Sequence, residues 1–123
     1  MKILVVDDHE SMRRIVKQIL MDIGFTNIEM ADDGATAYPM LLNGNFDFLV
    51  TDWNMPQMTG IDLLRKVRSN DTLKTMPVLL VTAETKKEQI IAAAQAGVND
   101  YVVKPFNAQT LKTKIERIFA KLG

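Results

Sequence analysis

Three aspartates, a threonine and a lysine are the residues of this sequence best suited to chemistry, because each stands just behind a short apolar run. Asp7 and Asp8 follow the first run. Asp52 comes two residues after another, and Thr82 and Lys104 follow two more. Carboxylates held within a few ångströms repel one another, so at neutral pH they take up a proton or recruit a cation. Ligands that are all oxygen suit Mg²⁺, which often shares its site with a phosphate.

These residue types fit the transfer of a phosphoryl group onto a carboxylate. Asp52 would be the nucleophile, and a bound cation would shield it from the negative charge of the incoming group. Lys104 offers a mobile positive charge to one phosphate oxygen, and Thr82 can donate a hydrogen bond to another. The residue types therefore predict a site that forms an aspartyl phosphate.

Each of these residues also has a plain structural explanation. Asp7, Asp8 or Thr82 could cap a helix, and Asp52 with Asn54 could make a turn. In an open parallel sheet, however, ligands bind outside the carboxyl ends of the strands. Polar residues at four such ends of one chain favour a shared site.

The apolar runs indicate strands, and the segments between them show helical spacing. Four of the five runs are continuous, as expected for strands covered on both faces. The runs are residues 3–6, 27–31, 48–50, 78–81 and 101–103. Helical spacing is clearest over residues 12–23 and 111–122, and residues 61–67 and 90–96 are shorter candidates.

This alternation of strands and helices predicts an α/β fold. We expect a doubly wound, five-stranded parallel sheet with right-handed crossovers and helices on both faces. The chain has 123 residues, of which 47% are hydrophobic, and this suits one domain with a single core. Residues 1–123 are therefore expected to form a single domain.

Pro39 complicates the helix expected over residues 33–43. In a helix that began at residue 33 or 34, Pro39 would lie in the second turn, where a missing N–H weakens the helix. A later start with Thr36 as N-cap would put it in the first turn. We expect either this late start or a kink at Pro39.

Composition excludes several classes of function. The 15 basic residues balance 15 acidic ones, so nothing indicates the basic footprint of nucleic-acid or anionic-membrane binding. The absence of cysteine excludes disulfides and thiol chemistry. His9 alone cannot build a histidine metal cluster, and it is interpreted as a solvated residue at a helix start. No apolar stretch approaches the roughly 18 residues of a membrane span, so we expect a cytoplasmic monomer without membrane insertion.

Four short motifs carry a family resemblance. They are Val5-Val6-Asp7-Asp8, Thr51-Asp52-Trp53-Asn54-Met55-Pro56, Val81-Thr82-Ala83 and Lys104-Pro105-Phe106. These motifs resemble the receiver domains of two-component response regulators, and the stretch over residues 81–106 is most similar to receivers of the chemotaxis type. The resemblance covers essentially the whole chain. It implies the flavodoxin-like receiver fold with strand order 2-1-3-4-5.

The resemblance implies a role for each matched residue of the phosphorylation site. Asp52 would accept the phosphoryl group, with Lys104 and Thr82 assisting the transfer. Mg²⁺ would be held by Asp8, Asp52 and the backbone carbonyl of Asn54, while Asp7 would act through a bound water.

Further roles implied by the resemblance concern signalling. Thr82 and Tyr101 would form a switch pair, in which Thr82 moves toward the phosphoryl group and Tyr101 follows inward. Asn54 and Glu84 would tune the lifetime of the phosphoryl group. The peptide bond between Lys104 and Pro105 would be cis, which is largely a proline property.

In functional terms, the resemblance implies a single-domain response regulator and not an enzyme, one that assists only its own phosphoryl transfer and autodephosphorylation. A histidine kinase would phosphorylate Asp52, and the phosphorylated protein would bind the flagellar motor switch protein or another target. A phosphatase is a further expected partner. The alternatives are a Mg²⁺-dependent phosphatase or phosphotransferase acting on an external substrate, and a phosphorelay receiver outside chemotaxis. Five residues differ from those expected in chemotaxis receivers, and these differences leave the identity of the partners open. They are His9, Pro39, Thr59, Asp100 and Lys112.

Overall fold

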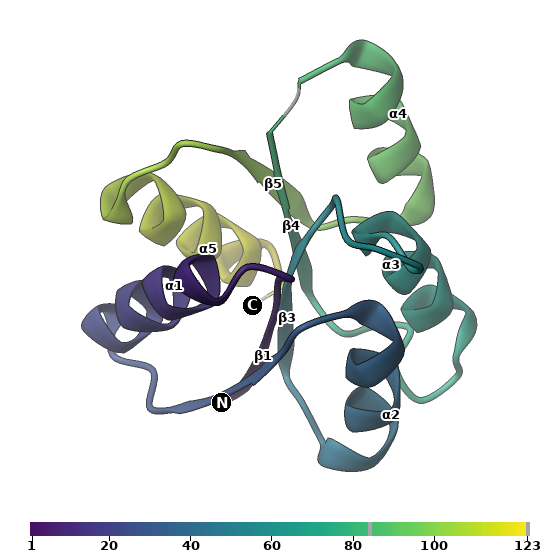
Figure 1. The fold of residues 1–123 in the computed structure, drawn as a ribbon, viewed down its shortest axis with the longest axis horizontal. Coiled ribbons are helices and arrows are strands. Elements are labelled where there is room, and N and C mark those ends of the chain that lie inside the picture. The colour runs from purple at the N-terminus through teal and green to yellow at the C-terminus, as the bar shows by residue number, and fades with distance from the viewer. Residues whose placement is uncertain (84, 123) are drawn as a thin grey trace.

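Five parallel strands form the centre of the protein, in a computed structural model that describes residues 1–83 and 85–122 (Figure 1). The strands are β1 (Lys2–Val6), β2 (Asn27–Ala31), β3 (Phe48–Asp52), β4 (Val78–Thr82) and β5 (Asp100–Val103). They lie in the order β2-β1-β3-β4-β5, which confirms the predicted topology. The adjacent strands β1, β3, β4 and β5 therefore end side by side.

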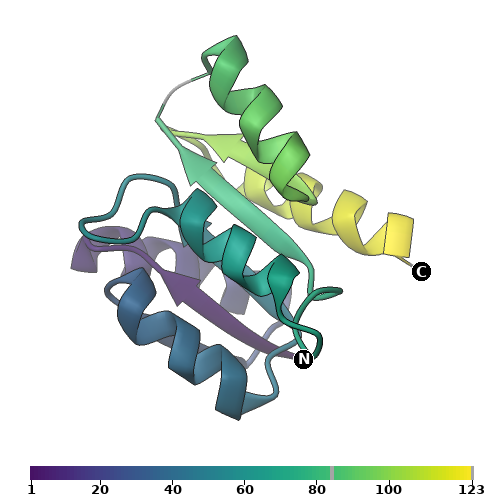
Figure 2. The same cartoon turned by 90° about the vertical axis from the view of Figure 1, so that its right-hand side faces the viewer.

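Five helices cover both faces of this sheet. They are α1 (Glu10–Ile23), α2 (Gly34–Gly44), α3 (Gly60–Ser69), α4 (Lys87–Ala96) and α5 (Ala108–Leu122). Helices α1 and α5 lie on one face, and α2, α3 and α4 lie on the other, in front of the sheet in Figure 2. No helix within the described residues is both long and apolar enough to cross a membrane.

Side chains that alternate along each strand divide the core into two layers. In β1, Ile3 and Val5 pack with α1 and α5, whereas Leu4 and Val6 pack with the helices of the other face. All five residues of β3 and of β4 are buried, so these strands read as continuous apolar runs up to their polar ends. This burial fixes the ends of β3 and β4, where Asp52 and Thr82 stand.

Helix α2 begins before Thr36, which one of the two expectations had placed at its N-cap. It starts at Gly34, because the Asp33 carboxylate caps it by accepting a hydrogen bond from the Thr36 N–H at 2.6 Å. The predicted late start with Thr36 as N-cap is therefore wrong. Pro39 lies inside the helix, beyond the first turn, and the kink expected there stays a prediction.

Arg68 of α3 fixes the C-terminal end of α4. Its guanidinium donates to the Gly97 carbonyl at 2.9 Å, to the Met76 carbonyl at 2.6 Å and to the Asn99 side-chain oxygen at 2.9 Å. Burial lowers the pKa of Arg68 from its ordinary value. These bonds join α3, α4 and the start of β4 on the face opposite α1 and α5.

Gly60 provides a test of how closely the fold holds the end of β3. A Cβ at this first residue of α3 would lie 2.2 Å from the Asp52 carbonyl oxygen, which is main chain and cannot turn away. We expect Gly60→Ala to lower the free energy of unfolding by about 2 kcal/mol, measured by urea titration.

Gly34→Ala is the matched control, because Gly34 is also the first residue of its helix and its Cβ would meet the Met58 side chain, which can move. The control should lose clearly less stability than Gly60→Ala. Equal losses in the two variants would contradict the close approach at Asp52.

Candidate functional site

The polar residues predicted to act together do meet at one edge of the sheet. Asp7 directly follows β1, Asp52 is the last residue of β3, Thr82 is the last residue of β4, and Lys104 directly follows β5. Parallel strands place their carboxyl ends together. The side chains therefore converge because four adjacent strands all end in polar residues.

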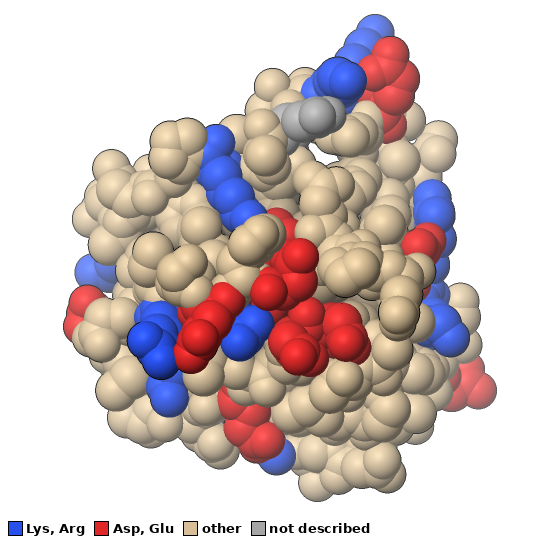
Figure 3. All heavy atoms as spheres, viewed as in Figure 1, with Lys and Arg blue, Asp and Glu red and all other residues tan. Residues whose placement is uncertain are grey.

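An acidic cluster lies at the centre of this edge. One ligand atom from each of Asp7, Asp8, His9 and Asp52 lies within 4.8 Å of the others. Asp7 and Asp52 are buried, with 3% and 4% exposure, whereas Asp8 is open to solvent. Acidic atoms gather at the middle of the face viewed in Figure 3, with positively charged side chains beside them. The cluster thus combines two buried carboxylates with an accessible one.

Lys104 supplies a positive charge to the buried carboxylates. Its ammonium lies 2.9 Å from Asp52 Oδ1 and 3.7 Å from Asp7 Oδ2. The backbone N–H of Lys104 donates to the Thr82 carbonyl at 2.8 Å, which anchors the residue to the end of β4. The peptide bond to Pro105 is cis, as predicted.

Burial and mutual repulsion disfavour the charged form of Asp52. Burial is the largest cause and raises the pKa of Asp52, and the charges of Asp7 and Asp8 raise it further, against the opposing hydrogen bond from Lys104. For Lys104, burial lowers the pKa but the contacts with Asp52 and Asp7 outweigh it, so the pKa is raised. Lys104 therefore compensates the acidic cluster only in part.

The oxygen-rich composition of this cluster fits a hard divalent cation. Carboxylate oxygens of Asp7, Asp8 and Asp52 lie close enough to share one ion. Mg²⁺ prefers oxygen ligands and keeps several waters when it binds a protein. The exposed side of Asp8 leaves room for those waters.

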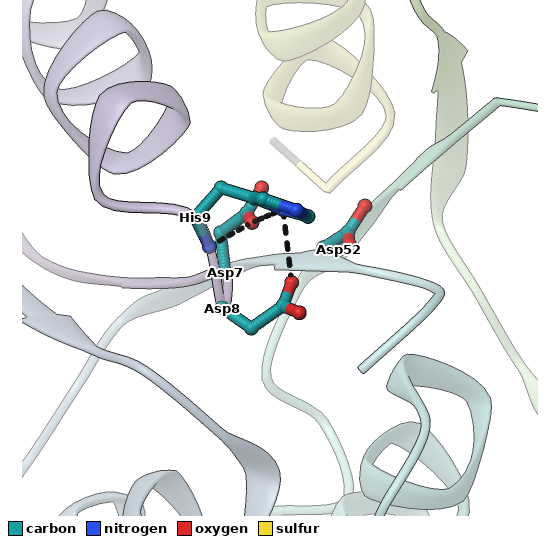
Figure 4. Close-up of side chains that lie close together, drawn as sticks. All are labelled: Asp7, Asp8, His9 and Asp52. Carbon is teal, nitrogen blue, oxygen red and sulfur yellow. Dashed lines mark hydrogen bonds and ion pairs between the residues drawn. The ribbon is translucent and has the colours of Figure 1, made fainter. Parts of the chain in front are cut away.

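His9 is an exposed residue at the start of α1, as expected, and it also contacts the acidic cluster. Its side chain is 66% exposed, yet its Nδ1 lies 3.2 Å from Asp7 Oδ1 and 3.1 Å from Asp8 Oδ1. The imidazole turns toward both carboxylates in Figure 4. His9 stands at the N-cap of α1 without a side-chain capping bond, so its ring is directed to the cluster and not to the helix.

Thr82 and Tyr101 lie on the same face of the sheet as neighbours across β4 and β5. Leu80 pairs with Tyr101 in the register, so Thr82 is offset from Tyr101 by two residues. Thr82 is buried and Tyr101 is half-buried. Tyr101 also lines a pocket of about 340 Å³ at the β5–α5 side of the molecule. The two predicted switch residues therefore lie on the same face of neighbouring strands, and their coupling stays a prediction.

Two further residues are predicted to tune the lifetime of the phosphoryl group. Asn54 is exposed in the loop between β3 and α3, and Glu84 lies outside the described residues. Trp53, between Asp52 and Asn54, is 9% exposed and can report on the site.

Sequence reasoning missed two contacts near the site. Arg13 of α1 donates to the Asp7 carbonyl at 2.7 Å. The Asp100 carboxylate accepts from Lys114 at 3.2 Å, and the Lys114 ammonium lies 5.1 Å from the centre of the Tyr101 ring. The Arg13 contact uses a backbone carbonyl, which leaves no signal in residue types. Asp100 did stand out as a departure from the expected pattern, and this was the one available signal.

The raised pKa of Asp52 makes stability depend on pH. Because the folded state binds a proton more tightly than the unfolded chain, stability falls as pH rises from about 3.8 through the folded pKa. At pH 7 in EDTA, Asp52→Asn should therefore be more stable than the parent, by about 1 kcal/mol in urea titrations. The difference should shrink toward low pH, and also in Mg²⁺, which stabilises the parent by mass action.

Asp71→Asn is the control for this prediction, since the Asp71 side chain is fully exposed and lies in the connection from α3 to β4, at the opposite end of the strands from Asp52. It should change stability by less than about 0.5 kcal/mol. A parent more stable than Asp52→Asn in EDTA at pH 7 would show that Asp52 is not held at a cost.

Known proteins are similar to this chain in sequence. Residues 3–116 match the response regulator receiver domain. A chemotaxis protein CheY of Pseudomonas aeruginosa is 70% identical over 123 residues, which covers 100% of this chain and 99% of that protein. Chemotaxis protein CheY-3 of Vibrio cholerae is 64% identical over 122 residues, which covers 99% of this chain and 94% of that protein.

Solved structures agree in fold. The chemotaxis response regulator CheY4 of Vibrio cholerae superimposes with a TM-score of 0.88 at 37% identity and covers 95% of this chain and 97% of its own. A putative response regulator from Chloroflexus aurantiacus gives a TM-score of 0.90 at 31% identity, with 97% of both chains covered. With the family match, the strand order and the acidic edge of the sheet in agreement, the chain belongs to the response regulator receiver domain family.

Proposed function

We propose that this protein is a phospho-receiver of chemotaxis signalling that is phosphorylated on Asp52. The observation that carries the proposal is the position of Asp52: a buried carboxylate 2.9 Å from the Lys104 ammonium and beside Asp7 and Asp8. Among the carboxylates of the cluster, Asp52 has the closer contact with Lys104. A nucleophile, a site for a cation and a positive charge for phosphate thus meet at one residue.

The reaction needs little covalent chemistry from the protein. An Asp52 carboxylate oxygen forms a bond to phosphorus as the bond from phosphorus to the donor breaks, and the donor leaves with that electron pair. A phosphohistidine donor becomes imidazole after taking up a proton, and acetyl phosphate becomes acetate. Lys104 balances charge on the phosphoryl oxygens, and Thr82 donates a hydrogen bond to one of them.

Mg²⁺ is the proposed cofactor. Asp8, Asp52 and the backbone carbonyl of Asn54 would hold it, with Asp7 acting through a bound water. When bound, the ion supplies charge neutralisation between the carboxylates and the phosphoryl oxygens. The hydrogen bonds of Asp7, whose carbonyl accepts from Arg13 and whose Oδ1 accepts from the His9 backbone N–H at 2.8 Å, keep that carboxylate in place.

The proposed partners follow from the relatives, two of which bear the name of a chemotaxis protein. A histidine kinase would be the phosphodonor, the flagellar motor switch protein the target, and a phosphatase a further partner. The protein would act in the cytoplasm as a monomer and as a single domain over residues 1–123. Asn54 and Glu84 would set how long the phosphoryl group persists.

Thr82 and Tyr101 are the proposed switch pair. Thr82 belongs to the site through the bond from its carbonyl to the Lys104 backbone, and Tyr101 belongs to the pocket on the β5–α5 side. Because the two residues share a face of the sheet, a shift of Thr82 toward the phosphoryl group would open space for the Tyr101 ring. The pocket that a target contacts would then depend on phosphorylation.

Turnover of an external substrate has less support. The longest connection between elements covers only residues 70–77, and it follows α3 on the side away from the carboxyl ends of the strands. Short connections provide little material for a substrate-binding cap. A receiver of a phosphorelay outside chemotaxis would use the same site, and the identity of its target distinguishes it.

Intact mass spectrometry tests the proposed phosphorylation. Acetyl phosphate with Mg²⁺ should add one phosphoryl group to the parent protein and none to Asp52→Asn, because Asp52 alone would combine the nucleophile with the ion and Lys104. Asp71→Asn, altered at an exposed carboxylate, should be labelled as the parent is. Equal labelling of Asp52→Asn would refute the assignment.

The switch pair can be tested through Tyr101 itself, since the chain has only two tyrosines. In protein labelled with 3-fluorotyrosine, acetyl phosphate with Mg²⁺ should shift the ¹⁹F resonance of Tyr101, which Tyr38→Phe assigns. Thr82→Val keeps the shape but lacks the hydroxyl, so the shift should fall by at least about half while phosphorylation persists. Thr82→Ser keeps the hydroxyl and should retain more of the shift. A full shift in Thr82→Val would exclude the pair.

A further inference from the structure

The imidazole of His9 occupies a position among the carboxylates that a metal ligand would occupy. Its Nδ1 lies 3.2 Å from Asp7 Oδ1 and 3.1 Å from Asp8 Oδ1, and all the donor atoms of the cluster lie within 4.8 Å of one another. The ring approaches from the exposed side of the site, because 66% of its side chain is accessible. The Lys104 ammonium contacts Asp7 Oδ2, so it and the His9 ring do not compete for the same oxygen of Asp7.

These separations match the edges of an octahedral coordination shell. Two ligands at right angles on an ion with bonds of about 2.1 Å lie about 3.0 Å apart. The two contacts of Nδ1 have close to this length, one to each carboxylate. An ion bound to Asp8 Oδ1 would therefore have Nδ1 at the spacing of a neighbouring ligand, while Asp7 could still act through a bound water.

The geometry points to His9 as a nitrogen ligand that widens the metal preference of this site from Mg²⁺ toward later first-row transition-metal ions such as Ni²⁺. The inference rests on the proposed function, since it concerns the ion of the same site. It adds a nitrogen ligand to a site where Asp7, Asp8 and Asp52 supply only oxygen atoms.

Ligand chemistry decides the direction of this preference. Carboxylate, carbonyl and water ligands suit Mg²⁺, whereas imidazole nitrogen suits the later first-row ions. Mg²⁺ gains little from replacing a bound water by imidazole, but affinity for Ni²⁺ rises with each nitrogen donor. His9 should therefore affect the ratio of the two affinities far more than the affinity for Mg²⁺.

Metal titrations of the intact protein, free of any histidine tag, test this ratio. Trp53 adjoins Asp52 and is 9% exposed, so its fluorescence is the readout for both Mg²⁺ and Ni²⁺. In His9→Gln, the dissociation constant for Ni²⁺ should rise at least about tenfold, while that for Mg²⁺ changes less than about threefold. Asp8→Asn is the control that should weaken the binding of both ions.

A spectroscopic readout identifies the ligand directly. His9 is the only histidine of the chain, so an imidazole nitrogen coupled to bound Mn²⁺ in electron spin-echo spectra can come from no other residue. The coupling should be present in the parent and in Asp71→Asn, and absent in His9→Gln. Absence of the coupling in the parent, or an unchanged Ni²⁺ to Mg²⁺ ratio in His9→Gln, overturns the inference.

The two proposals fail in different ways. If acetyl phosphate with Mg²⁺ still labels Asp52 while the ratio is unchanged, the role of His9 alone is wrong. If labelling is absent as well, the proposed function is wrong too.

Discussion

The ion pair between Lys104 and Asp52 is the interaction on which the site depends. Carboxylates that are buried side by side destabilise a fold unless their charge is compensated. The 2.9 Å contact with Lys104 compensates Asp52 in part, and the pKa of Asp52 stays raised nonetheless. The remaining negative charge can attract a divalent cation, and the cation can in turn attract the oxygens of a phosphoryl group. The same imbalance that weakens the metal-free fold therefore provides the binding energy for the ion.

Main-chain hydrogen bonds hold these charges in place. The Lys104 N–H donates to the Thr82 carbonyl, the Trp53 N–H donates to the Val81 carbonyl at 2.9 Å, and the Gly60 N–H donates to the Trp53 carbonyl at 2.8 Å. The first two bonds tie a connection to the buried end of β4, and the third closes the loop between β3 and α3. Because β3 and β4 are buried along their full length, the connections share the rigidity of the sheet. Asp52 is thus held beside Lys104, Asp7 and Asp8 by the main chain, so its repulsion with the other two carboxylates is not relieved by movement of the loops.

The sequence allowed a correct prediction of the strands and of the convergence of Asp7, Asp8, Asp52 and Lys104, because continuous apolar runs mark buried strands and polar residues mark their ends. The strand order was implied by the family resemblance alone. Of the two alternatives expected for α2, the late start with Thr36 as N-cap is wrong, since the helix penalty of Pro39 was weighed without the capping bond from Asp33. His9 is the exposed residue at a helix start that was expected, but its contacts with Asp7 and Asp8 were not foreseen, because exposure does not reveal where a side chain points. Arg68 gave no signal at all, as most of its partners are backbone carbonyls of distant segments.

The acidic face of Figure 3 belongs to a protein whose formal charge is zero. At physiological ionic strength, electrostatic fields fade over about 8 Å, so the negative potential of the cluster is confined to the mouth of the site. An anionic phosphodonor can therefore diffuse up to the surface without long-range repulsion. It is repelled by the carboxylates only in the last step, when it enters the site. The rate of encounter with a small phosphodonor should then depend only weakly on salt concentration. A kinase that phosphorylates the protein faster than a small donor does must rely on docking elsewhere on the surface rather than on long-range attraction.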